Sequence, residues 1–399
     1  MKYYKQNSQQ GAVSLFVVIF AMLLISIVTI GFVRLMVQNQ EQAINNDLSQ
    51  SAYDSATAGT EDAKRALLTY RTACEDTSAA GRSRCSQLAA YLNSAICNEG
   101  VQRVNQDSFT PGEVLIQQSA TDGQLDQAYT CVKIALQTDG YEGTLEENTS
   151  KLIPLKSGGA YNTVVLKWFV RDNLAGTNPN VTLDIPSGPA PTLYSQTNWG
   201  NRRPPLMRTQ LMQVGTNGFT LTGFDTSAGS QSNANTMFLY PIGTTGVANA
   251  AQDTWNFSNR DVRRSGGIAP LATRCSGTLA SGGYACTARL QLPQPLGNPG
   301  ASIDRTAFLR LTALYNATDF RIELYNDATP VMFDSVQPSI DSTGRANDVF
   351  RRLESRVDLV NTTFPFPEAT IDITGNLCKN SIVTNSAGEY KSGADTCTP

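Results

Sequence analysis

The segment Ala12–Val33, AVSLFVVIFAMLLISIVTIGFV, contains 22 residues without a charge. As an α-helix this segment is about 33 Å long, which matches the hydrocarbon core of a lipid bilayer. So long an apolar surface is unfavourable in water. We therefore predict that Ala12–Val33 spans a membrane.

The residues before this span, MKYYKQNSQQG, include Lys2 and Lys5 and no acidic residue. Basic flanks stay in the cytoplasm, so we expect a single-pass membrane protein with its N-terminus in the cytoplasm and its head outside. A secretory signal peptide is one alternative, but its apolar region is about 7 to 15 residues long and ends in small residues. This run is longer and ends in Phe32, Val33 and Arg34. A plain uncleaved anchor remains a second alternative.

The helical pattern continues beyond the span. Apolar or small residues recur at spacings of three and four, as on one face of an α-helix. These positions are Ile44, Leu48, Ala52, Ala56, Gly59, Ala63, Ala66, Leu67 and Tyr70. Because no proline occurs before Pro111, we predict one helix from about Ala12 to about Arg71, roughly 90 Å long.

Small residues dominate the middle of this stripe, and they let another helix or a sheet approach closely. We expect six stripe residues to pack: Ile44, Leu48, Ala52, Ala56, Gly59 and Ala63. After Ala63 the expected surface is the chain's own domain. Between Arg34 and Gly59 a partner helix is at least as good an interpretation.

The composition excludes several kinds of chemistry. The chain has 399 residues and no histidine, so a Ser-His-Asp triad, a Cys-His pair and a histidine-ligated metal are excluded. With 31 Lys and Arg against 34 Asp and Glu, no basic field favours nucleic acid. No phosphate-binding, dinucleotide-binding, nucleophile-elbow or EF-hand motif is present. We expect no catalytic residue, no metal and no cofactor.

Eight cysteines, an even number without any C-x-x-C spacing, favour disulfides in an exported head. They are Cys74, Cys85, Cys97, Cys131, Cys275, Cys286, Cys378 and Cys397. Short loops favour Cys74 with Cys85, Cys275 with Cys286, and Cys378 with Cys397, which leaves Cys97 for Cys131. Other connectivities remain open, since eight cysteines allow 105 pairings.

The sequence of the first part of the head predicts a short helix followed by strands. Helical spacing covers Ser83–Asn98, with Gly100 as a stop signal. Alternation predicts a strand over Thr130–Leu136, which would bring Cys131 to the end of that helix. An almost wholly apolar strand, Val164–Val170, is expected in the interior of a sheet.

The middle of the head, from Asn173 to Gly300, reads largely as loop with short apolar runs such as Leu206–Val214 and Met237–Ile242. Aromatic residues in this region, at Tyr194–Trp199 and Trp255–Phe257, are candidates for surface aromatics of the kind that bind carbohydrate or protein. The competing interpretation is an ordinary packed core.

The region Arg305–Val360 predicts an antiparallel meander with a turn at Ser342-Thr343-Gly344. Its four expected strands are Ala307–Tyr315, Phe320–Tyr325, Val331–Val336 and Val349–Val360. On the last strand we expect a charged face and an apolar face. The charged face holds Arg352, Glu354, Arg356 and Asp358, and the apolar face holds Val349, Leu353, Val357 and Leu359.

Carboxylate pairs such as Glu146-Glu147 and Glu61-Asp62 are candidates for acid–base chemistry. Glu146-Glu147 lies in an expected loop, and Glu61-Asp62 lies on the long helix. We interpret both as solvated charges, since nothing in the sequence indicates a surrounding cleft.

The N-terminal residues resemble the type IV pilin-like proteins, and most closely PilX-type minor pilins. A short basic leader ends in glycine, the apolar segment begins at once, and the helix continues into a small and acidic pattern. The matching residues are Gln10, Gly11, Arg34, Asn46-Asp47, Ala52, Ala56, Gly59, Glu61 and Asp62. The resemblance covers about the first 70 residues.

This resemblance implies cleavage between Gly11 and Ala12 by a prepilin peptidase. It implies as partners other pilin or pilin-like subunits, a membrane assembly platform, membrane lipid, and a surface ligand of the head. One position departs from the family pattern: the fifth residue after the cut, a glutamate in most major pilins, is Phe16 here. The departure argues against a major subunit.

The expected fold class is α+β, a long N-terminal α-helix followed by a globular head with an antiparallel β-sheet, a short helix and disulfide-closed loops. Its parts are a leader (1–11), a transmembrane half-helix (12–33), an amphipathic half-helix (34–72) and an extracytoplasmic head (73–399). The expected function is that of a non-catalytic minor pilin-like subunit in pilus assembly and surface display. The alternatives are a membrane-anchored adhesin or binding module, a type II secretion pseudopilin, and an anchored hydrolase that uses carboxylates alone.

Overall fold

The structure is a computed structural model of the whole chain, and it describes residues 10–117, 127–174, 181–185, 194, 196–213, 234–243, 253–258, 270–279, 282–296 and 307–359. Within the chain Met1–Val360 forms one compact unit and Asn361–Pro399 a second. The second unit, with Cys378 and Cys397, lies outside the described residues. The predicted disulfide between these two cysteines therefore stays a prediction.

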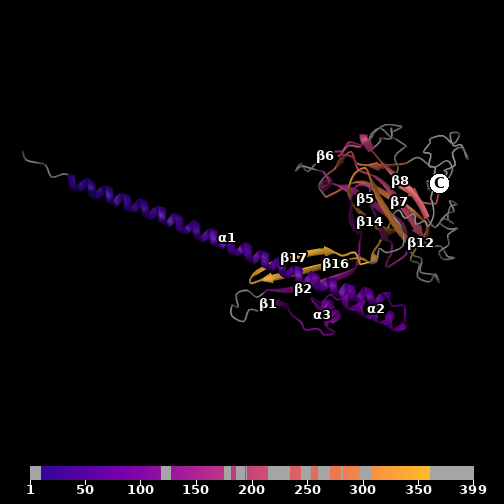
Figure 1. Ribbon diagram of the computed structural model, residues 1–399, viewed down its shortest axis with the longest axis horizontal. Coiled ribbons are helices and arrows are strands. Elements are labelled where there is room, and N and C mark those ends of the chain that lie inside the picture. Colours follow the sequence, from indigo (N-terminus) through magenta and orange to yellow (C-terminus); the bar gives the residue numbers. More distant parts are fainter. Residues whose placement is uncertain are drawn as a thin grey trace, which may run out of the picture. The chain divides into compact units, whose positions relative to one another are not determined.

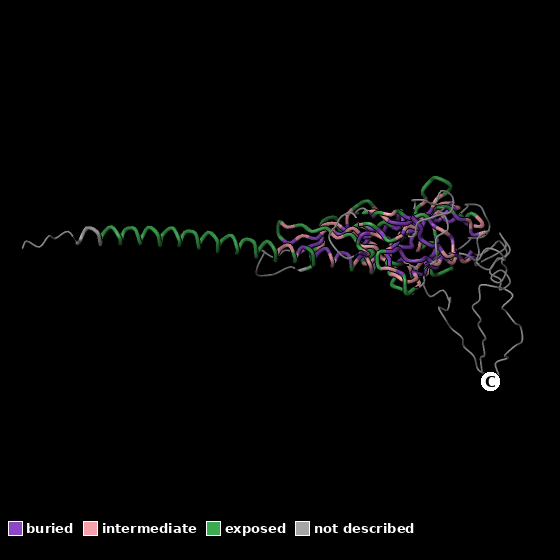
Figure 2. Tube along the Cα trace, turned by 90° about the horizontal axis from the view of Figure 1, so that it is seen from above, coloured by how far each residue is buried: buried purple, intermediate pink, exposed green. Residues whose placement is uncertain are grey.

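The predicted long helix is present as α1, Gln10–Glu75. It begins two residues before the predicted start and ends four residues after the predicted end. Residues are exposed along the first part of α1, drawn in green in Figure 2, whereas buried residues alternate with exposed ones along its last part. The long apolar N-terminal helix followed by a sheet-rich head confirms the general layout, and most of the head is β-structure.

Two short helices follow, and their bounds differ from the prediction. α2 covers Ala79–Leu92, and its N-terminus is capped by the hydroxyl of Ser78, which accepts from the Gly81 amide at 3.0 Å. α3 covers Glu99–Gln106, so Gly100 lies inside a helix and is not a stop. A Cβ at Gly100 would lie 2.8 Å from the Tyr91 carbonyl oxygen. The glycine is therefore needed where α3 approaches α2.

The last half of α1 packs on a four-stranded antiparallel sheet, which we call the stem sheet (Figure 1). Its strands, in the order β1-β2-β16-β17, are β1 (Val114–Gln117), β2 (Gln127–Thr138), β16 (Phe333–Ala346) and β17 (Val349–Arg356). β2 confirms the strand predicted over Thr130–Leu136. The buried residues between helices and sheet form their own core, which includes Leu67, Leu88, Leu92, Val132 and Ile340.

The predicted turn at Ser342-Thr343-Gly344 is wrong. These residues lie inside β16, and the chain reverses instead at Asn347-Asp348, between β16 and β17. Asn347 has a left-handed backbone with φ 51°, a conformation that asparagine tolerates better than most residues. Glycine in a strand can mark a close approach of another backbone rather than a turn.

A second sheet of eleven strands, which we call the large sheet, occupies the chain between β2 and β16. Its strands are β3 (Tyr141–Leu145), β4 (Ser150–Pro154), β5 (Tyr161–Val170), β7 (Leu206–Gln213), β8 (Ala234–Gly243), β9 (Thr254–Asn256), β10 (Leu271–Cys275), β12 (Tyr284–Leu296), β13 (Ala307–Leu314), β14 (Thr318–Asn326) and β15 (Thr329–Val331). A separate pair joins β6 (Val181–Thr182) to β11 (Thr278–Leu279). Short 3-10 turns cover Arg171–Asn173 and Gln196–Asn198.

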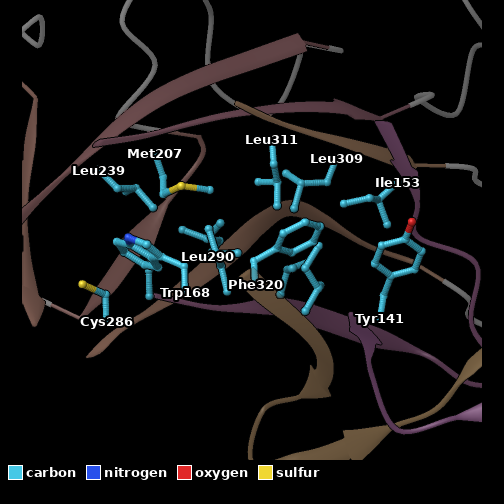
Figure 3. Close-up of a cluster of buried hydrophobic side chains, with 14 of the residues drawn as sticks. Tyr141, Ile153, Trp168, Met207, Leu239, Cys286, Leu290, Leu309, Leu311 and Phe320 are labelled. Carbon is cyan, nitrogen blue, oxygen red and sulfur yellow. The ribbon is translucent and has the colours of Figure 1, made fainter. Parts of the chain in front are cut away.

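The large sheet has its own hydrophobic core (Figure 3). Trp168, Leu290 and Phe320 come from three neighbouring strands, β5, β12 and β14, and all three side chains are almost fully buried. The indole nitrogen of Trp168 donates to the Pro205 carbonyl at 3.2 Å. β5 has a strand on each side, which confirms that Val164–Val170 lies in the interior of a sheet.

The predicted meander over Arg305–Val360 is largely wrong. β13 pairs with β4 and β7, whereas β14 pairs with β3, β5 and β15, so these consecutive strands are not neighbours. Only the β14–β15 and β16–β17 hairpins follow the expected order. Much of Asn173–Gly300 is also strand rather than loop, including the 13 residues of β12. Partners distant in the sequence decide these pairings.

Candidate functional site: the long helix and its packing surface

The first part of α1 carries apolar side chains that contact no other part of the described chain. Its large hydrophobic residues from Leu15 to Val37 are all exposed, for example Phe16 at 70% and Phe32 at 71%. α1 is the one helix within the described ranges that is long and apolar enough to cross a membrane. Gly11 and Ala12 lie in its first turn.

Farther along α1, the helix backbone lies directly on β16 and β2. A Cβ added at Gly59 would lie 2.6 Å from the Ser342 hydroxyl oxygen and 2.7 Å from a methyl group of Val132. Such distances are shorter than any real Cβ contact. Only glycine therefore permits the helix to approach the sheet this closely.

The sheet has a matching glycine on its side of the contact. A Cβ added at Gly344 would lie 2.2 Å from both the Ala52 carbonyl oxygen and the Ala56 amide nitrogen. Two residues earlier, the hydroxyl of Ser342 donates to the Ala56 carbonyl at 2.7 Å. Arg351 of β17 also contacts α1, because it donates a hydrogen bond to the Ser49 hydroxyl at 2.8 Å.

These contacts correct the expected partner of the small-residue stripe. Ala52, Ala56 and Gly59 are buried, as Ala63 is, and the surface that covers them is the chain's own sheet rather than a partner helix. Leu48 is half-buried and Ile44 is exposed. A partner helix thus has free access to the stretch before Leu48, where the helix has left the sheet.

The acidic residues of α1 have separate roles. Glu61 is exposed and pairs with Lys64 at 2.6 Å on the helix surface. Asp62 is half-buried and accepts the Tyr129 hydroxyl at 3.0 Å, while its backbone carbonyl accepts from Asn105 at 3.0 Å. Burial, and then the Asp62 charge, raise the pKa of Tyr129. Asp62 therefore joins helix to sheet and is not a solvated charge as expected.

Three of the four expected disulfides are present: Cys74–Cys85 and Cys275–Cys286, which short loops favour, and Cys97–Cys131, which the other pairings left over. Cys74–Cys85 joins α2 to the end of α1, and Cys97–Cys131 joins the α2–α3 connection to β2. Cys275–Cys286 joins β10 to β12 in the large sheet. No free cysteine occurs among the described residues.

A network of charges lies where the large sheet joins the stem sheet. Arg321 of β14 contacts three carboxylates: Asp139 at 2.7 Å, Glu323 at 2.8 Å, and Glu142. From the stem side, Arg356 donates to the Gly140 carbonyl at 2.7 Å. Although burial raises the pKa of Asp139 and Glu323, the hydrogen bonds from their basic partners hold both values below the usual range.

The loop aromatics are core residues. Trp199, Trp255 and Phe257 are buried, and only Tyr194 is appreciably exposed, at 38%. The proposal of a surface aromatic platform is therefore wrong for these three residues. Trp255 and Phe257 belong to the core of the large sheet, and Trp199 belongs to a smaller cluster with Leu206, Tyr240 and Ile242.

The other carboxylate pair lies on the surface. Glu146 and Glu147 lie in the expected loop between β3 and β4, exposed. Glu147 accepts hydrogen bonds from Asn148 and Gln196, both at 3.2 Å. The described ranges contain no cluster of three or more acidic, cysteine or histidine residues that could hold a metal ion.

The predicted alternation of the last strand is confirmed only in part, because β17 ends at Arg356, before Val357, Asp358 and Leu359, and Arg356 is half-buried rather than on a solvated face. Leu353 and Val349 face α1, and Arg352 and Glu354 lie on the exposed face of the stem sheet.

Comparison of the chain with protein-family models, with characterised proteins and with solved structures finds no match.

Proposed function

We propose that this chain is a minor pilin-like subunit that takes part in the assembly of a type IV pilus or a related filament and displays its head at the surface. The observation that carries the proposal is the division of α1 into two halves. One half has exposed apolar side chains, and the other half is seated on an antiparallel sheet through small residues.

The exposed half has two ways to avoid water. In a bilayer, lipid covers Leu15 to Val37, and the basic leader stays in the cytoplasm while the head lies outside. On leaving the bilayer, the same side chains must exchange lipid for neighbouring helices, and a filament core provides such helices. The partners are other pilin-like subunits, an assembly platform and a prepilin peptidase that cuts between Gly11 and Ala12.

The seated half supports the same proposal. Because Ala52, Ala56 and Gly59 are covered by the chain's own sheet, the head is fixed to the helix from Leu48 onward. A pull on the helix therefore moves the head with it. The role is structural, and no catalytic step is assigned to any residue.

The test is the N-terminal mass of the chain recovered from membranes and from sheared surface filaments. We expect a mature chain that begins at Ala12, with or without a methyl group, and Gly11→Val should retain the leader. Recovery in sheared filaments separates a pilus subunit from a secretion pseudopilin. A chain that keeps Met1 in membranes would instead indicate an anchored binding module and would overturn the proposal.

A further inference from the structure

The surface of the large sheet contains an open pocket of about 410 Å³ on the face that carries Lys167, Thr287 and Arg289. β5, β12 and β14 form its floor and part of its wall, because Val165 lies opposite Arg289 on one side and Glu323 on the other. Val165 and Ala285 give the floor an apolar surface and are almost fully buried. The half-buried Thr287 adds a hydroxyl.

Charged side chains surround this floor, and the positive ones are in excess. The lining contains Lys167, Arg274 and Arg289 against Asp253 and Glu323. Three positive charges and two negative charges leave a net charge of +1. A concave surface with this balance favours an anionic ligand.

The buried acid of the pocket is already engaged. Glu323 is 9% exposed, and one of its oxygens accepts from both Lys167 and Arg321 at 2.8 Å. Its other oxygen accepts the Tyr325 hydroxyl at 3.2 Å. Glu323 therefore orients Lys167 and Tyr325 and has little remaining capacity to bind a ligand or to neutralise Arg289.

Arg289 is held in place but has no carboxylate partner within the described ranges. Its guanidinium lies over the Tyr325 ring at 5.1 Å, and one nitrogen donates to the Asp327 carbonyl at 2.9 Å. A planar guanidinium fixed in this way loses little entropy when it binds a second acceptor, and carboxylates and sulfates match its paired donors.

We propose that the pocket lined by Lys167, Thr287, Arg289 and Tyr325 binds the carboxylate of an acidic saccharide. Arg289 and Lys167 contact the carboxylate, Thr287 and Asp253 exchange hydrogen bonds with ring hydroxyls, and the aliphatic floor contacts the apolar face of the sugar ring. The volume lies within the range of small-molecule sites and admits a single sugar ring. This site does not depend on filament assembly, so its loss leaves N-terminal processing unchanged.

The experiment is calorimetric titration of the full chain in detergent micelles at low salt with three probes, sodium glucuronate, glucose and sodium sulfate. We expect glucuronate to bind with a Kd on the order of 1 mM and glucose to bind at least about tenfold more weakly, since glucose cannot engage Arg289 and Lys167 as charges. Arg289→Gln should weaken glucuronate binding at least about tenfold.

The matched control is Arg352→Gln, which removes an exposed arginine from the stem sheet and should change glucuronate affinity less than about twofold. Arg289→Lys keeps the charge but not the planar pair of donors, and an intermediate affinity is expected. If Arg289→Gln fails to fold, Arg289→Lys and Lys167→Gln carry the test. Absence of binding, equal binding of glucose, equal binding of sulfate, or unchanged affinity in the Arg289 variants would each overturn the assignment.

Discussion

At the scale of single residues, two glycines and one serine decide how α1 meets the stem sheet. Gly59 and Gly344 face each other's elements, and any side chain at either position would overlap atoms of the other element. Ser342 lies on the same strand as Gly344, and its hydroxyl donates a hydrogen bond to the carbonyl oxygen of Ala56 on α1. Small residues here are a steric requirement of the contact rather than a weakness of the helix.

We therefore expect Gly344→Ala to destabilise the chain strongly. The new methyl group would lie 2.2 Å from backbone atoms of Ala52 and Ala56, and a helix backbone cannot move aside as a flexible side chain can. Overpacking of this kind costs about 3 kcal/mol of the free energy of unfolding. Urea unfolding of the full chain in detergent, followed by circular dichroism, measures the loss.

Gly277→Ala is the matched control for this substitution. Gly277 has no heavy atom within 4 Å of its ideal Cβ position, so its change should be within about 0.5 kcal/mol of zero. Equal stability of Gly344→Ala and Gly277→Ala would mean that α1 does not rest on β16 at Gly344. The size of the difference therefore reports the closeness of the helix–sheet contact.

At the scale of secondary structure, the sequence predicts the elements whose cause is local. The long helix follows from an uninterrupted run and a repeated spacing, and α1 differs from its prediction by a few residues at each end. β2 and β5 follow from alternation and from a continuous apolar run. What the sequence does not predict is which strands pair, because β13 and β14 are adjacent in sequence yet have different neighbours.

The same limit explains the misplaced turn and the correction to the packing stripe. Ser342-Thr343-Gly344 has the composition of a turn, and only the presence of Ala52 and Ala56 across the contact explains a glycine there. Ala52 and Gly59 fit a helix partner and a sheet partner equally well by sequence. Residue spacing therefore does not tell whether a helix or a sheet covers these small residues.

The charge network at the junction of the two sheets makes stability depend on pH. The pKa values of Asp139 and Glu323 are held below their usual range in the folded chain. Carboxylates with lowered folded-state pKa values add stability above their unfolded pKa, and this stability is lost as pH falls through the folded value. We expect the unfolding midpoint of the wild-type chain to decrease between about pH 5 and pH 3.

Arg321→Gln should flatten this dependence, because it removes a cation that contacts Asp139, Glu142 and Glu323. The difference in stability between wild type and variant should be greater at pH 6 than at pH 3. Arg352→Gln, which removes a more exposed arginine that pairs with a single carboxylate, Asp341, serves as control and should follow the wild-type curve. If the difference in stability between Arg321→Gln and wild type is the same at all pH values, the charge network is not the source of the pH dependence.

At the scale of the whole molecule, the described part of Met1–Val360 contains, besides the short β6–β11 pair, two larger sheets with separate cores, and the large sheet interrupts the stem sheet in sequence. The chain leaves the stem sheet after Thr138 and returns at Phe333, and these two residues are paired neighbours. An insertion whose ends lie side by side leaves the surrounding strands in register. The residues proposed for assembly lie on α1, and those proposed for ligand binding lie in the insertion.

This division predicts that the large sheet can be removed without loss of the stem. Residues 139–332 would be replaced by Asn-Gly, a two-residue hairpin connection between β2 and β16. Phe333 and Val336 pack in the core of the large sheet, so Phe333→Thr and Val336→Thr should accompany the deletion. We expect the shortened chain to keep its Cys97–Cys131 disulfide, to enter the membrane and to begin at Ala12 after processing.

The measurements are disulfide mapping, N-terminal mass and glucuronate titration of the shortened chain beside the full chain. Retained processing with lost glucuronate binding would place assembly and display in separate parts of the sequence. The full-length Phe333→Thr, Val336→Thr chain is the control for damage caused by the substitutions alone. If the shortened chain loses its Cys97–Cys131 pairing while this control keeps it, then β16 couples the two cores so tightly that the stem cannot fold without the insertion. The reason would be that β16 contributes to both cores: Val336 packs in the core of the large sheet, and Ile340, four residues later, packs in the core between α1 and the stem sheet. Exchange of the large sheet for another domain would then require replacement of β16 as well.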